Sequence, residues 1–155
     1  MRGAIGARAR AHDERGQVGG IEVLPLGALV LVVGTLLVAN AWAVVDAKLT
    51  TSAAAREAAR AYVEAPSADE AWRQAEQAAA QTVEGHGRDP EALSLEQASG
   101  HFGRCRRVVV EASYPVPALA LPWIGGFEHG FVVRSRHSEV VDPYRSGLDG
   151  AAACG

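Results

Sequence analysis

Two cysteines, Cys105 and Cys154, have the most direct covalent chemistry in this chain. Two are too few for a disulfide framework. A single bridge would close a loop of about 50 residues, which contributes about 4 kcal/mol of stability by the chain-entropy relation. Disulfides persist outside the cytoplasm and are rare inside it. We expect the bridge if the C-terminal part is exported, and two unpaired thiols are the alternative.

The other residue types that perform chemistry lack the spacing that chemistry needs. No zinc-binding spacing and no G-x-S-x-G is present, and "GQVGG" lacks the Lys-Ser/Thr of a phosphate-binding loop. We therefore predict no enzyme, no metal and no cofactor. A net charge of −3 and a pI near 5.9 also argue against a nucleic-acid partner. The histidines considered as ligands are His12, His86, His101, His129 and His137.

Glu22 is a single carboxylate directly before an uncharged run, Val23 to Val45. As a helix this run is about 35 Å long, enough for the roughly 30 Å hydrocarbon core of a bilayer. The alternative is a buried helix of a soluble protein, but a chain this short could hardly surround so apolar a helix. We expect a membrane segment. A carboxylate at its edge is costly unless it is paired.

The run and the residues before it fit either a retained anchor or a cleaved signal. Arginines precede it, and Ala39–Ala41 and Ala41–Ala43 both resemble signal-peptidase sites. The apolar run is longer than a usual signal core, so we expect an anchor that is kept. The excess of arginine before the span favours a cytoplasmic N-terminus. We predict a cytoplasmic basic leader (1–20), a transmembrane helix (21–45) and an extracytoplasmic α+β domain (46–155).

Beyond the run, the sequence predicts more helix. "DAKLTTSAAAREAARAYVEA" (46–65) is rich in helix formers, so one helix is expected from about Gly20 to Ala65. Its alanine stripes permit close approach of another helix, or they merely reflect composition and helix propensity. Pro66 should end the helix, and Ser67 with Glu70 resembles a capping box for a second helix closed by Gly85. The two stripes are Ala54, Ala58 and Ala61, and Ala55, Ala59 and Tyr62.

The C-terminal part alternates like a sheet. Leu93–Leu95 suggests a short strand, "RRVVVEASY" (106–114) alternates clearly, and "GFVVRSRHSEVV" (130–141) alternates until Asp142-Pro143. A small α+β domain with an antiparallel sheet is therefore expected. The apolar loop between the later strands, 115–127, either folds over the sheet or meets the membrane or a neighbouring subunit. Its large apolar residues are Leu119, Leu121, Trp123, Ile124 and Phe127.

The order of these parts resembles type IV pilins and pseudopilins. More narrowly, "AAAREAAR" (53–60) and "RHSEVVDPYRSGL" (136–148) resemble TadE-like pseudopilins of tight-adherence (Flp) pilus systems, actinobacterial members in the second case. The resemblance covers roughly 15–148. It implies a pilin-like fold with a minor, non-catalytic role in pilus assembly. The implied partners are other pilin-like subunits, the Tad assembly platform, membrane lipid and a prepilin peptidase.

The same resemblance implies roles for three residues near the membrane. The family's peptidase cuts after a glycine, here Gly16, which leaves Gln17 as the new N-terminus. The family's glutamate, here Glu22, then pairs with the terminal ammonium of a neighbouring subunit. That glutamate is fifth after the cut in the family, whereas Glu22 is sixth after Gly16. A cut between Gln17 and Val18 restores the spacing but loses the glycine.

The sequence therefore predicts a single-pass membrane pseudopilin that acts by helix packing with pilin-like subunits. The alternative, from another class, is a secreted or membrane-anchored extracytoplasmic binding domain with residues 1–43 as targeting segment. A cut after Ala43 would support that alternative.

Overall fold

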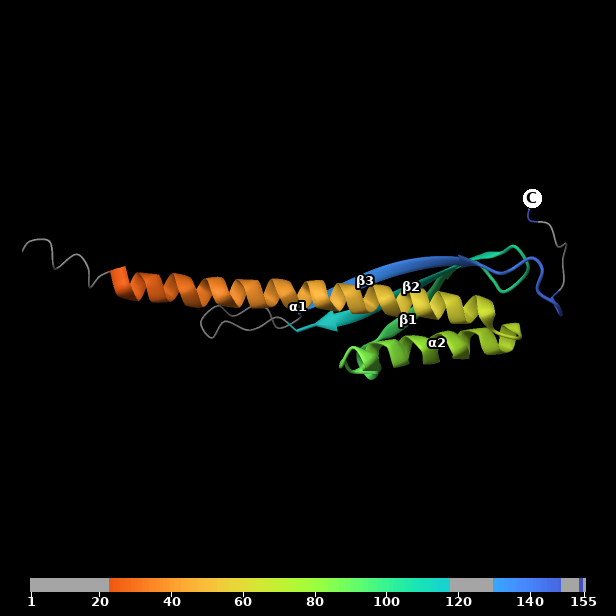
Figure 1. The fold of residues 1–155 in the computed structure, drawn as a ribbon, viewed down its shortest axis with the longest axis horizontal. Coiled ribbons are helices and arrows are strands. Elements are labelled where there is room, and N and C mark those ends of the chain that lie inside the picture. The colour runs from red at the N-terminus through yellow and green to blue at the C-terminus, as the bar shows by residue number, and fades with distance from the viewer. Residues whose placement is uncertain (1–22, 118–129, 149–153, 155) are drawn as a thin grey trace, which may run out of the picture. The chain divides into compact units, whose positions relative to one another are not determined.

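A computed structural model describes residues 23–117, 130–148 and 154 (Figure 1). The chain divides into two compact units, Met1–Val38 and Ala39–Gly155. The α+β class, a long apolar helix, a second helix and a small antiparallel sheet are confirmed. The elements in chain order are α1 (Val23–Glu64), α2 (Ala68–Gly85), the 3₁₀ turn η3 (Pro90–Ala92), β1 (Ser94–Ser99), β2 (Arg107–Val116) and β3 (Phe131–Val140).

Helix α1 begins in the first unit and ends in the second. Its last residues match the expectation, because Pro66 disfavours helical geometry in the residue before it. Ala43 and Val44 pack against the core of the second unit, and Ala47 is fully buried. The second unit begins at Ala39, and these side chains belong to its core.

Helix α2 starts where the sequence predicted, but without the side-chain cap. Ser67 is its N-cap residue, and its side chain makes no capping hydrogen bond, so the proposed capping box is wrong in that detail. The Ser67 carbonyl accepts the N–H groups of Glu70 and Ala71, as the carbonyl of an N-cap residue ordinarily does. At the other end Gly87 has a φ of 69°, a left-handed geometry that glycine adopts without strain, and its N–H donates to Glu84 O.

The sheet has the order β1-β2-β3 with both pairs antiparallel. Side chains of β2 alternate between buried and more exposed positions, as the sequence predicted. The first strand is longer than expected and lies one residue later, at Ser94–Ser99. The buried β2 residues are Val108, Val110, Ala112, Tyr114 and Val116.

One apolar core joins the later part of α1, one face of α2 and the inner face of the sheet. Tyr62 of α1 makes edge-on ring contacts with Trp72 of α2 and with Phe102. Trp72 thus packs against the first helix. The core alanines let these elements approach closely, and they are Ala47, Ala54, Ala58, Ala59, Ala65, Ala71, Ala75 and Ala79.

The alanine stripes of α1 are therefore covered by the chain's own domain, apart from Ala61, which is half-buried. Ala54, Ala55, Ala58 and Ala59 have no exposed surface, and Tyr62 is 5% exposed. These side chains are not available to a second subunit while the domain is folded. Any packing between subunits has to use other surfaces of the helix.

Candidate functional site

The first candidate surface is the apolar part of α1. It contains a window with a mean hydropathy of 2.3, none of which is buried, and it is the one helix in the described ranges that is long and apolar enough to cross a membrane. Leu24, Leu31 and Trp42 are each about 70% exposed. Such large exposed apolar side chains are unfavourable in water and favourable in lipid or against another apolar helix.

The residues expected to control processing and assembly, Gly16, Gln17 and Glu22, lie outside the described residues. Their roles stay predictions. The same holds for the leader 1–20 and for the apolar segment with Trp123 between β2 and β3.

Cys105 and Cys154 are joined by a disulfide, which is the first of the two alternatives that the sequence left open. Their Cα atoms are 5.3 Å apart, within the usual range for such a bond. Cys105 lies in the left-handed region, with a φ of 59°. Its N–H donates to Val141 O, which extends the pairing of β2 with β3 up to the bridge.

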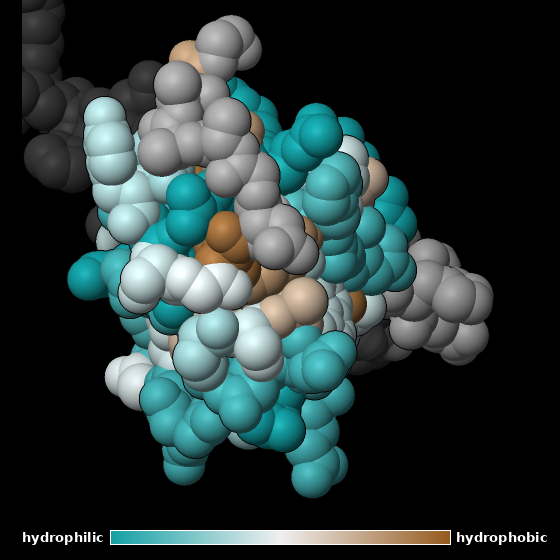
Figure 2. Space-filling view, turned by 90° about the vertical axis from the view of Figure 1, so that its right-hand side faces the viewer, coloured by the Kyte–Doolittle hydropathy of each residue, from teal (hydrophilic) through white to brown (hydrophobic). Residues whose placement is uncertain are grey.

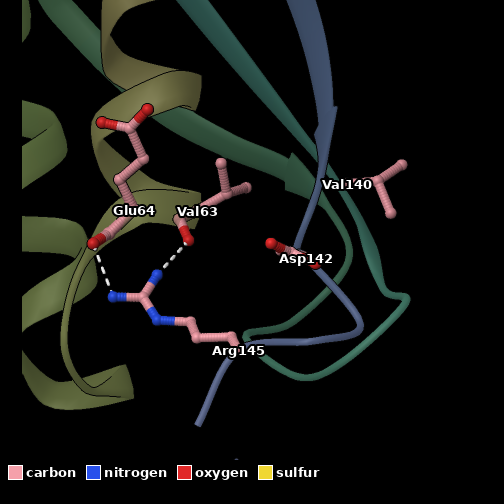
Figure 3. A pocket seen from close by; sticks show the side chains of 5 residues that line it. All are labelled: Val63, Glu64, Val140, Asp142 and Arg145. Atoms are coloured by element: carbon pink, nitrogen blue, oxygen red, sulfur yellow. Dashed lines mark hydrogen bonds between the residues drawn. The ribbon is translucent and has the colours of Figure 1, made fainter. Parts of the chain in front are cut away.

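Arg145 holds the end of α1, and sequence reasoning did not single it out. Its two terminal nitrogens donate to Val63 O and Glu64 O, each at 2.6 Å (Figure 3). These carbonyls have no partner further along the helix, and a cation near them also suits the helix dipole. Arg145 belongs to the "DPYRSG" stretch, where no periodicity marks it.

A surface pocket of about 460 Å³ lies beside this contact, lined by Val63, Glu64, Val140, Asp142 and Arg145 (Figure 3). The guanidinium of Arg145 is directed at the helix end, where its donors are used. Among the described residues no group of three or more His, Cys, Asp or Glu could hold a metal ion. The pocket thus offers no metal-binding set among the described residues.

Two further cations fasten α1 to the rest of its domain. Arg88 donates to Asp46 at 2.6 Å and lies over the ring of Tyr114, 5.4 Å from its centroid. Lys48 donates to the backbone oxygen of Arg134 in β3. Because these partners are far apart in the sequence, no local pattern could have indicated them.

Nearer its end, α1 carries one pair of exposed charges that acts locally. Arg60 and Glu64 form an i,i+4 pair at 3.0 Å, and both side chains are more than 60% exposed. The hydrogen bond to Glu64, and next its charge, raise the pKa of Arg60 above its ordinary value. Arg60 therefore stays charged at every physiological pH and provides no pH switch.

Comparison with family models, curated proteins and solved structures found no match.

Proposed function

We propose that this chain is a single-pass membrane subunit of the TadE-like pseudopilin type, and that it supports assembly of a tight-adherence pilus without catalysing a reaction. The observation that carries the proposal is that the two parts of α1 have different surroundings. Its first part is apolar and exposed, while its later part forms the core of an α+β domain. Such a helix can hold a folded domain at a membrane and still offer side chains to neighbours.

Retention of the helix is supported by its continuity. Both A-x-A sequences, at 39–41 and 41–43, lie inside α1, and Ala43 and Val44 contribute to the core. A cut after Ala43 would remove one of these two side chains from the folded unit. We therefore propose that the mature chain keeps the whole of α1 and is not cut at either A-x-A sequence.

The surface for other pilin-like subunits is then the exposed apolar part of α1, since the alanine stripes are covered. Packing of helices within a bilayer depends on close contact, and Gly27 and Gly34 leave open space around their Cα atoms. We propose that these glycines lie in or near the contact. Processing by a prepilin peptidase at Gly16, with Glu22 paired to a neighbour's ammonium, belongs to the same proposal.

In-cell crosslinking tests this packing. A photo-crosslinking residue is placed in turn at each position from 27 to 33, which covers nearly two helical turns, with Gln77 on the exposed side of α2 as a control position. We expect adducts with other single-span subunits on one side of α1 and none from Gln77. The absence of protein adducts at all positions from 27 to 33 would refute packing through this part of α1.

A further inference from the structure

The end of the β2–β3 hairpin exposes apolar side chains. Pro115 and Val116 of β2 lie opposite Val132 and Phe131 of β3 in the register of the sheet. Phe131 is 51% exposed and Val132 is 57% exposed. At this end Gly130 has a φ of 56°, and a Cβ there would come within 2.5 Å of Val116 O, so the close approach of the two strands requires glycine.

The position of this end along α1 follows from two hydrogen-bond contacts. Lys48 contacts the backbone of Arg134 near the start of β3, and Arg145, beyond the strand, contacts the end of α1. Strand β3 therefore runs in the same direction as the later part of α1 (Figure 1). Phe131 precedes Arg134 by about 10 Å of strand. The same distance along α1 leads from Lys48 back to about Trp42.

The change from uncharged to charged residues occurs at a similar level in both elements. In α1 the uncharged run ends at Val45, and Asp46 and Lys48 follow. In β3 the first charged residue is Arg134, whose backbone oxygen accepts the hydrogen bond from Lys48. Trp42 is 71% exposed at this level, and tryptophan is enriched where a membrane meets water.

The other end of the domain is different. Figure 2 shows the end where α1 finishes and α2 begins, and the atoms in colour there are mostly hydrophilic with a small apolar patch. The turn after α2 is polar as well. The hydrogen bond from Arg88 to Asp46 places this turn beside Asp46 of α1. Among the described connections and ends of this unit, the end of the β2–β3 hairpin is thus the one that exposes large apolar side chains and also lies at the same height along α1 as Trp42.

We infer that the end of the β2–β3 hairpin, where Pro115, Phe131 and Val132 are exposed, is a lipid-binding surface that enters the headgroup region beside α1. This inference rests on the proposed anchoring of α1 in a membrane. Burial of apolar side chains at the boundary between headgroups and acyl chains is favourable. The cationic residues Lys48 and Arg134 follow on the side away from the membrane, where positive charge suits anionic headgroups. The domain would then contact the membrane at a second place, which limits its rotation about the helix.

Spin-label accessibility in the full chain tests this surface. The chain is placed in vesicles of phosphatidylcholine and phosphatidylglycerol in equal parts, with one label at Val132→Cys. Ser138→Cys is the matched control, because both residues belong to β3 and have the same strand parity, which places them on one face. Leu29→Cys reports on the span itself.

We expect the ratio of collisions with oxygen to collisions with a polar nickel complex to be several-fold higher at Val132 than at Ser138. An equally low ratio at both sites, with a high ratio at Leu29, would overturn the inference and leave the anchoring intact. A low ratio at Leu29 as well would overturn both. A label at Val132 shielded from both reagents would indicate contact with protein and also overturn the inference.

Discussion

At the scale of single residues, a few cationic side chains and one disulfide hold distant parts of the domain together. Arg145 occupies the last carbonyls of α1, and Arg88 joins Asp46 to the ring of Tyr114. The Cys105–Cys154 bridge fixes the far end of the chain to the turn that precedes β2. Each contact joins residues that are distant in the sequence, so each stabilises tertiary structure more than local structure.

Replacement of Arg145 by alanine should lower the free energy of unfolding by about 1–3 kcal/mol, because two charge-assisted hydrogen bonds are lost. Urea denaturation of the detergent-solubilised chain measures the change. Tyr144→Ala is the matched control, since that side chain is 83% exposed, and it should stay within about 0.5 kcal/mol of the unmodified chain. Equal stability of the two variants would contradict the assigned role of Arg145.

Reduction of the disulfide should lower the free energy of unfolding by about 4 kcal/mol, because the reduced chain gains loop entropy when it unfolds. Urea denaturation with and without reductant measures the difference. The double variant Cys105→Ser, Cys154→Ser should be insensitive to reductant. An unmodified chain that alkylates at both cysteines before reduction would show that the bridge is absent.

At the scale of elements, the later part of α1 uses alanine to bring a helix and a sheet close together. Ala58 has no exposed surface and belongs to the core with Ala75 and Val110. A larger side chain at such a place forces neighbouring atoms apart. The density of this packing, and not helix propensity alone, explains why alanine occupies these positions.

Ala58→Leu should therefore destabilise the domain by about 1–3 kcal/mol through overpacking. Arg56→Leu on the exposed side of the same helix should change stability by no more than about 0.5 kcal/mol. Thermal unfolding followed by near-ultraviolet circular dichroism compares the two variants. A neutral Ala58→Leu would mean that the alanine face of α1 is open and could meet another subunit.

The sequence was sufficient to predict the elements where local physics decides. Proline after α1 and alternation in β2 predicted their bounds and faces, since both act between near neighbours. Which surface covers the alanine stripes was not predictable, because composition alone allows an internal or an external partner. The role of Arg145 was not predictable either, because its partners are 81 and 82 residues away along the chain.

At the scale of the whole molecule, the orientation in the membrane can be read from one amine. Lys48 is the only lysine, its side chain is exposed, and it follows the apolar run. If the domain is extracytoplasmic, a membrane-impermeant amine reagent added to spheroplasts should modify Lys48. Peptide mass spectrometry detects the product, and Lys48→Arg is the matched control. Modification of Lys48 only after lysis would place the domain in the cytoplasm.

The most direct test of the pseudopilin account is the mature N-terminus of the membrane-extracted chain. Its intact mass is measured from cells with and without the prepilin peptidase. The account predicts a peptidase-dependent N-terminus at Gln17 or Val18, which would leave Glu22 near a new ammonium group. An N-terminus after Ala41 or Ala43 in both cells would contradict it and favour a secreted domain, and an uncut chain would contradict processing.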